Sequence, residues 1–155
     1  MVKMAKKTKR KYVFKHNSPT EHYVADAYTV RCVDNRFWKA KKRFIKHLGL
    51  KHIDPKSPAG GAKVFVSPQK KSDVDRMLRE LEISIRLHHV KRVMLFNHHD
   101  CGAYGGFARF DNDPDKELKF HRADLKKASA VIKERFPKLK VETYFIDDEG
   151  IIRTS

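Results

Sequence analysis

The sequence predicts an α/β fold of three layers, in which helices flank a central, mostly parallel β-sheet. The first observation is that short apolar runs alternate with longer segments of helical periodicity along the 155 residues, as in folds built from strand–helix–strand units. The second is that these runs are apolar almost throughout, instead of at every second position. Continuous apolar runs are typical of parallel strands that helices cover on both faces.

The first half of the chain is expected to hold a strand, a helix and a second strand. The first strand lies in "YVADAYTVRCVD", residues 23–34. A helix follows in "RFWKAKKRFIKHLG", residues 36–49, because its apolar residues recur at helical spacing and Gly49 can end it. The prolines and glycines of "HIDPKSPAGG", residues 52–61, predict a loop. The short run "AKVFV", residues 62–66, is expected to be a strand.

The second half is expected to repeat this alternation. A long helix begins near Ser72, the expected N-cap, and the run "KRVMLF", residues 91–96, predicts a buried strand. Another helix covers about residues 117–135, where we expect His121 to be a surface or capping residue. A last strand in "KVETYFID", residues 140–147, precedes a turn.

Charge is concentrated at the start of the chain. The formal net charge is +16, and seven of the residues from Lys3 to Lys15, both included, are Lys or Arg. We expect residues 1–20 to form a flexible, solvated basic arm and residues 21–155 to form a single α/β domain. The arm could also bind nucleic acid, although we do not favour this interpretation.

The composition also predicts the cellular setting. No apolar run approaches the ~20 residues that a membrane-spanning helix needs, and the basic start lacks the apolar region of a secretory signal. Two cysteines that lie 69 positions apart provide no disulfide framework. We therefore expect a cytoplasmic protein without membrane partners, in which cysteines are more often metal ligands or catalytic groups.

The first candidate motif is "CVDNR", which contains Cys32, Asp34 and Arg36. If the strand continues through the motif, its alternation places these three side chains on one face. A carboxylate beside a guanidinium stays ionised and fixed, as an acceptor near a reacting group must be. The alternative is a surface ion pair next to a buried structural cysteine.

The second motif is "NHHDCGAYGG", residues 97–106, which follows a predicted strand as the first motif does. Sites in open α/β sheets gather at the carboxyl ends of strands. One zinc-like ion could take the thiolates of Cys32 and Cys101 and the imidazole of His98, which leaves a fourth position for Asp34 or water. The alternatives are hydrogen-bonded loop histidines, or a redox disulfide between the cysteines.

Taken together, Cys32-x-Asp34-x-Arg36 and His98-x-x-Cys101-Gly102 resemble the zinc-site signature of the β-class carbonic anhydrases. The segment "LRELEISIRLHHVKRVMLFNHHDCGA" is similar to the same region of that family, and the similarity covers roughly residues 24–152. The chain resembles a compact, divergent member, because it reads "SPAGG" where family members usually carry Arg-Asn before the Ala-Gly pair.

The resemblance implies a zinc enzyme, a carbonate dehydratase that interconverts carbon dioxide and bicarbonate by a zinc-bound hydroxide. The zinc ligands would be Cys32, His98 and Cys101, with His98 chosen over His99. Asp34 would pair with Arg36 or become the fourth ligand, and the Gly102 amide would bind substrate. The resemblance further implies a homodimer or higher even oligomer with sites near the subunit interface.

Two other functions stay open at this point. The same hydroxide could act on a related small molecule, COS or CS₂, because the altered segment "SPAGG", residues 57–61 and here called the middle loop, leaves room for a different pocket wall. Alternatively, the chain could be a non-catalytic zinc protein whose basic arm binds nucleic acid through phosphate contacts, which weaken with salt. The intact Asp34–Arg36 pair argues against a purely structural zinc, which would not need it.

Overall fold

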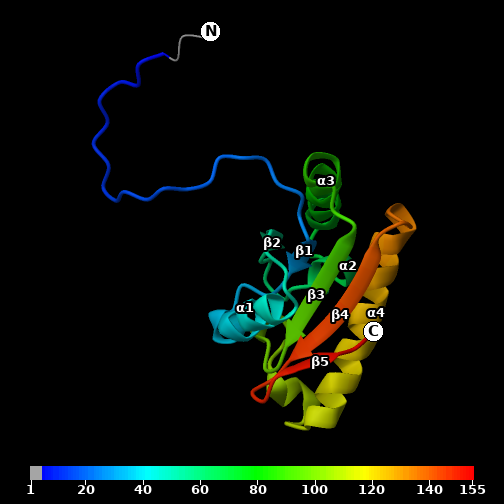
Figure 1. The fold of residues 1–155 in the computed structure, drawn as a ribbon. Helices are drawn as coiled ribbons and strands as arrows, with labels where there is room; N and C mark the ends of the chain where they lie inside the picture. The colour runs from blue at the N-terminus through cyan, green and yellow to red at the C-terminus, as the bar shows by residue number, and fades with distance from the viewer. Residues whose placement is uncertain (1–4) are drawn as a thin grey trace.

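The computed structural model describes residues 5–155, and its centre is a five-stranded sheet (Figure 1). The strands are β1 (Ala27–Val30), β2 (Ile53–Lys56), β3 (Arg92–His98), β4 (Lys140–Ile146) and β5 (Ile151–Arg153). They lie in the order β2-β1-β3-β4-β5. The first four are parallel, and β5 is antiparallel to β4. The predicted mostly parallel sheet is therefore confirmed.

Helices cover both faces of this sheet, as the three-layer prediction requires. The helices are α1 (Trp38–His47), α2 (Lys63–Val66), α3 (Lys71–His88) and α4 (Pro114–Arg135), with short 3-10 turns at Asn35–Phe37, Gly102–Tyr104 and Phe107–Phe110. Along β3, Val93 and Leu95 pack into a core with α2, α3 and α4, whereas Met94 and Phe96 pack into a second core with α1. Burial on both faces explains why the strand is apolar throughout.

Two segments of the middle of the chain differ from the prediction. The expected loop contains β2, in which Pro55 pairs with Thr29 of β1. A proline is tolerated there because β2 is an edge strand, where a missing N–H costs no ladder bond on the open side. The expected strand at residues 62–66 is instead the single-turn helix α2, because Gly60 and Gly61 turn the chain with positive φ angles immediately before it.

The starts of the two long helices also differ from the prediction. Helix α3 begins at Lys71, and the carboxylate of Asp73 accepts the backbone N–H of Lys70, so Ser72 is not the N-cap. Helix α4 begins at Pro114, three residues before the expected start, and Asp113 caps it. Apolar periodicity misses such first turns because they are polar and solvent-exposed. His121 on α4 is completely buried, so its assignment to the surface is wrong.

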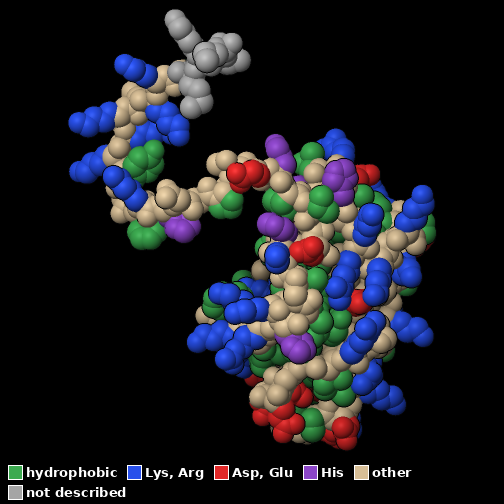
Figure 2. Space-filling view, viewed as in Figure 1, with side chains coloured by type: hydrophobic (Ala, Val, Ile, Leu, Met, Phe, Trp, Pro, Cys, Tyr) green, Lys and Arg blue, Asp and Glu red, His purple; other side chains and the backbone are tan. Residues whose placement is uncertain are grey.

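The segment before β1 runs away from the domain without helix or strand from residue 5 onward (Figure 1). Its side chains are exposed up to residue 22, including Tyr12, Val13 and Phe14. Figure 2 shows Lys and Arg side chains along this segment and over much of the domain face in view. Asp and Glu side chains gather mainly at the bottom of the domain in this view, away from the N-terminal segment. The positive charge therefore extends beyond the arm, whose flexibility stays a prediction.

The residues that the structure describes include no helix that is both long and apolar enough to cross a membrane.

Candidate metal centre

The carboxyl ends of β1 and β3 bring the two sequence motifs together. These strands are parallel neighbours, with Val30 paired to Leu95. Cys32 follows the first strand, His98 ends the second, and Cys101 lies in the turn beyond it. All three side chains are buried, and their potential ligand atoms lie within 4.8 Å of one another. The predicted convergence of residues 69 positions apart is thus present in the structure.

The spacing of the two cysteines fits a metal better than a disulfide. The Sγ atoms of Cys32 and Cys101 are 3.9 Å apart. Two thiolates bound at ~2.3 Å to one tetrahedral zinc ion would lie about 3.8 Å apart, whereas a disulfide needs about 2.05 Å. The thiols hydrogen-bond each other, and this bond lowers the pKa of Cys32 and raises the pKa of Cys101.

His98 presents one ring nitrogen to this cluster with no competing partner. Its Nδ1 donates to the His99 carbonyl oxygen at 2.7 Å, which leaves the lone pair on Nε2. Nε2 is buried and has no hydrogen-bond partner in the structure. Phe37 stacks on the ring with its centroid 4.8 Å away and fixes the ring plane. Burial alone lowers the pKa of His98, but the neighbouring Cys32 sulfur and the bond from Nδ1 to the His99 carbonyl raise the pKa above its usual value.

The middle loop supplies a backbone donor to the cluster. The N–H of Gly60 donates to the Cys32 Sγ at 3.2 Å. Gly60 has a φ of +81°, and a Cβ there would lie 2.9 Å from the Lys63 Cβ and 3.2 Å from the Ala103 Cβ. Only glycine fits this position without displacing its neighbours. The glycines of "SPAGG" are evident in the sequence, but the contact of Gly60 with the thiol was not predicted.

Asp34 and Arg36 form a bidentate ion pair beside the cluster. The Arg36 Nη2 lies 2.7 Å from the Asp34 Oδ2, and Nε lies 3.0 Å from the same oxygen. Hydrogen bonds from Arg36 lower the pKa of Asp34 to about 2, so its carboxylate is ionised across the physiological range. The Asp34 Oδ2 is 4.0 Å from the His98 Nε2, at the edge of the cluster.

Strand alternation was expected to place Asp34 and Arg36 on one face, but the pair arises in a different way. Strand β1 ends at Val30, and Asp34 is instead the N-cap of the 3-10 turn that begins at Asn35. The Asp34 Oδ1 accepts the backbone N–H of Arg36 at 2.9 Å. The cap and the ion pair therefore hold the carboxylate together.

A second carboxylate binds the other side of the Arg36 guanidinium. Nη1 lies 3.1 Å from the Asp100 Oδ2, and Nη2 donates to the Asp100 carbonyl at 2.9 Å. Asp100 has a φ of +54°, and the buried Glu117 carboxylate accepts its backbone N–H at 2.8 Å. The support of Arg36 by Asp100 was not predicted from the sequence. The only available signal was an aspartate in a tight turn, where left-handed backbone is tolerated.

His99 points away from the cluster. Its Nδ1 lies 2.7 Å from the Glu117 Oε2, and its ring packs edge-on against Phe107. His99 therefore stabilises a buried carboxylate of α4 and is not placed as a metal ligand.

Gly102 follows Cys101 directly and begins a 3-10 turn. A Cβ at this position would meet no atom within 4 Å, and its φ is not positive. Packing and backbone strain therefore do not explain the glycine, and its role in substrate binding stays a prediction.

Polar side chains behind the ligands are linked in a buried network. The Asn97 side chain accepts the N–H of Ala62 at 3.1 Å and donates to the Tyr104 hydroxyl, which in turn donates to Asp124 at 2.6 Å. The Asn97 Nδ2 also lies 3.1 Å from the His121 Nδ1. This network connects the middle loop to the strand that ends in His98, and sequence analysis did not identify it.

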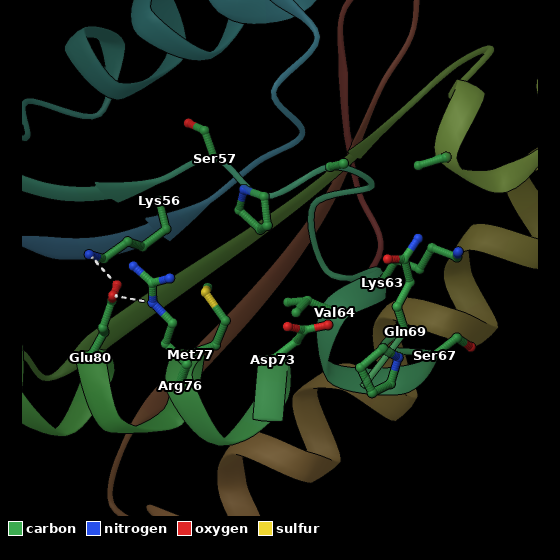
Figure 3. Close-up of a pocket in the computed structure, with 14 residues that line it drawn as sticks. Lys56, Ser57, Lys63, Val64, Ser67, Gln69, Asp73, Arg76, Met77 and Glu80 are labelled. Carbon is green, nitrogen blue, oxygen red and sulfur yellow. Dashed lines mark hydrogen bonds and ion pairs between the residues drawn. The ribbon is translucent and has the colours of Figure 1, made fainter. Parts of the chain in front are cut away.

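Two pockets border this region. The smaller one offers about 10 Å³, roughly the space of one water molecule. Its wall includes Cys32, Asp34 and His98, together with Arg31, Phe37, Phe96, Asn97 and Ile146. The larger one, of about 620 Å³, lies over the middle loop and α3 (Figure 3). Glu80 pairs there with both Lys56 and Arg76, and none of the three cluster residues lines it.

Comparisons with known proteins agree with the fold and with the family of the motifs. The family described as "Putative carbonic anhydrase" matches residues 24–154. An uncharacterized protein of Rickettsia conorii is 31% identical over 131 residues, which cover 83% of this chain and 70% of that protein.

Solved β-carbonic anhydrases share the fold at low sequence identity. Isoform I of Trichomonas vaginalis superposes with a TM-score of 0.60 at 14% identity, over 90% of this chain and 87% of that one. A tetrameric enzyme of Sordaria macrospora superposes with a TM-score of 0.56 at 15% identity, over 84% and 81%. From the extent of the family match, this chain belongs to the family described as "Putative carbonic anhydrase", and its fold is that of the β-carbonic anhydrases.

Proposed function

We propose that this protein is a zinc-dependent enzyme that catalyses the reversible hydration of carbon dioxide to bicarbonate. The observation that carries the proposal is the buried Cys32–His98–Cys101 cluster, whose unpartnered His98 Nε2 lies 4.0 Å from the ionised carboxylate of Asp34. Family membership supports the same reaction.

The residues present fit a zinc ion. Two sulfur donors and one imidazole nitrogen are a usual zinc ligand set, and three protein ligands leave one position open for chemistry. The buried His98 Nε2 has no other partner, which is costly unless something binds it. When bound, zinc would supply hydroxide near neutral pH by lowering the pKa of water.

Asp34 would be the acceptor that orients the attacking oxygen. Arg36 keeps the carboxylate ionised and fixed, so Asp34 can receive a hydrogen bond without taking up the proton at neutral pH. The attacking lone pair would then point at the carbon of CO₂. Asp100 would support Arg36 from its other side. The Gly102 amide would stabilise the developing bicarbonate.

The remaining parts of the proposal concern the assembly and its setting. We propose a homodimer or a higher even oligomer in the cytoplasm. A tetrameric β-carbonic anhydrase among the structures that share this fold supports an oligomer. Asp34 as a fourth metal ligand would compete with its pairing to Arg36, which is the arrangement in the structure.

Metal analysis combined with rate assays on three substrates tests the proposal. Purified protein should hold about one zinc per chain and hydrate CO₂ well above the buffer rate in stopped-flow assays. Turnover of COS or CS₂ without CO₂ hydration would show that the substrate is not CO₂, while the assignment of the metal site would stand. Deletion of residues 1–15 should leave turnover unchanged. A zinc-loaded protein that is inactive on all three substrates would reject an enzymatic role.

A further inference from the structure

Helix α1 carries a lysine that is buried without an anionic partner. The Lys41 side chain is only 7% exposed, and its Nζ donates to the Thr29 Oγ1 at 2.6 Å. The same Nζ lies 5.9 Å from the centre of the Phe96 ring. Among residues 5–155, no carboxylate lies within salt-bridge distance of this amine. A buried ammonium group without a counter-ion is costly, so this site shifts the protonation equilibrium towards the neutral amine.

The charge of another cation, Arg31, acts on this amine. It lies two residues after Thr29, and its N–H continues the sheet ladder to the Lys56 carbonyl, so both side chains are placed on the same face. Arg31 uses Nη1 to bind the carbonyls of Cys32 and Asp34 at 2.9 and 3.3 Å. Its other guanidinium nitrogens make no hydrogen bond within the described part of the chain, so they remain available to an anion.

Burial and the Arg31 charge both act on the amine. Burial is the larger cause, and together they lower the pKa of Lys41 to about 8. At pH ~7.5, about a quarter of such amines are neutral, against roughly a thousandth for an ordinary lysine. Neutral amines are the form that reacts with CO₂, because their lone pair is free.

We propose that Lys41 is a carbamylation site that reacts reversibly with CO₂. The Nζ lone pair forms a bond to the carbon of CO₂, one C–O π bond becomes the carboxylate, and the nitrogen releases one proton to water. The step needs no oxidant, reductant or metal. One carbamate oxygen would accept the Thr29 hydroxyl, and its charge would face the Arg31 guanidinium. A repulsive pair of cations would thereby become an attractive ion pair beside the carbonyls of Cys32 and Asp34.

The same helix supplies matched controls. Lys39 and Lys42 flank Lys41 in sequence and are exposed to solvent. The proposal needs only dissolved CO₂ and therefore does not depend on the activity of the candidate metal centre.

Chemical trapping locates the carbamate. The full chain would be equilibrated with ¹³C-bicarbonate at pH ~7.5, treated with triethyloxonium ion to convert carbamates to stable ethyl esters, digested, and sequenced by mass spectrometry. Lys41 should carry the ¹³C-ethoxycarbonyl group at an occupancy at least about tenfold above that of the exposed Lys39 and Lys42. The free α-amino group is the internal positive control, because its pKa is about 8.

A second measurement covers the case in which the trapping reagent does not reach a buried carbamate. ¹³C NMR of the intact protein under ¹³CO₂ should show a carbamate resonance that is lost in Lys41→Met and kept in Lys42→Met. Methionine fits the apolar surroundings of the lysine stem, and thermal unfolding would verify that both variants are folded. A labelled α-amine with no trapped label on Lys41, together with identical NMR spectra of the two variants, would overturn the proposal.

Discussion

The Arg36 guanidinium bridges two aspartates, with Nη2 2.7 Å from the Asp34 Oδ2 and Nη1 3.1 Å from the Asp100 Oδ2. Asp34 therefore does not depend on a single ion pair for its position. Asp100 is in turn held through its backbone N–H by Glu117 of α4. The arrangement joins the end of β1, the turn after β3 and the start of α4 at the rim of the candidate metal centre.

Replacing Asp100 by asparagine should reduce turnover without removing the metal. The amide oxygen can still accept the Phe107 N–H, but the charge that fixes Arg36 is lost. Because exposed ion pairs contribute only about 0.2–1 kcal/mol, we expect a decrease of roughly 2- to 5-fold in kcat/KM. Stopped-flow assays with zinc quantification would measure it. An equal loss of zinc and activity would instead place Asp100 among the groups that hold the metal.

Replacing each of the adjacent histidines His98 and His99 should have a different effect, on metal binding for the first and on fold stability for the second. His98→Ala removes the unpartnered Nε2 of the cluster and should weaken zinc binding by more than roughly 100-fold. His99→Ala should keep the zinc but destabilise the fold by about 1–3 kcal/mol, because the buried Glu117 loses a partner. Competition with a chromophoric chelator and chemical denaturation would measure both effects. The assignment of His98 is wrong if the two variants exchange these properties.

Gly60→Ala should disturb the centre through the backbone. A Cβ at this position meets the Lys63 Cβ at 2.9 Å on a left-handed backbone, which costs about 1–3 kcal/mol. Displacement of the N–H that binds the Cys32 Sγ should also lower zinc affinity by about tenfold. Gly150→Ala is the control, because a Cβ there meets nothing within 4 Å. Equal stability and zinc affinity in both variants would contradict the role of Gly60.

Burial lowers the pKa of His121 to about 4, which predicts a specific pH dependence of stability. The unfolded chain binds a proton at this ring near pH 6.5, whereas the folded chain does not until about pH 4. The contribution of the neutral His121 ring to the free energy of unfolding is therefore complete above pH ~6.5. It decreases by roughly 3 kcal/mol as the pH falls to about 4.

His121→Phe keeps the aromatic packing against Phe145 and should flatten the stability profile over this interval. Urea denaturation at several pH values would measure the slope. Parallel slopes in the two proteins, or an imidazole of His121 that titrates near pH 6.5 in NMR spectra, would show that the ring is not held neutral.

Local pattern was sufficient for most of the fold and for bringing the cluster residues together. The apolar runs of β3 and β4 are continuous because helices cover both faces, and that signal survives in sequence. Cys32, His98 and Cys101 were connected by one topological rule, that carboxyl ends of parallel strands share an edge.

The errors arose where tertiary contacts decide the structure. Pro55 is tolerated only because β2 lies at the sheet edge, and β-branched residues form α2 because Gly60 and Gly61 set its direction. The burial of His121 and the support of Arg36 by Asp100 are long-range polar contacts without periodicity. Such contacts leave no pattern in a single sequence.

The proposed reaction depends most on Asp34 as the acceptor beside a zinc ion, and the decisive variant is Asp34→Asn. Asparagine retains the size and the capping oxygen but not the charge that pairs with Arg36. Stopped-flow CO₂ hydration would compare wild type and variant at equal, measured zinc content. We expect measurable wild-type turnover that falls by roughly 100-fold or more in the variant, as the loss of a positioned acid–base group does. Equal turnover of the two zinc-loaded proteins would show that Asp34 is not the acceptor, and no turnover in the wild type would show that the protein does not hydrate CO₂.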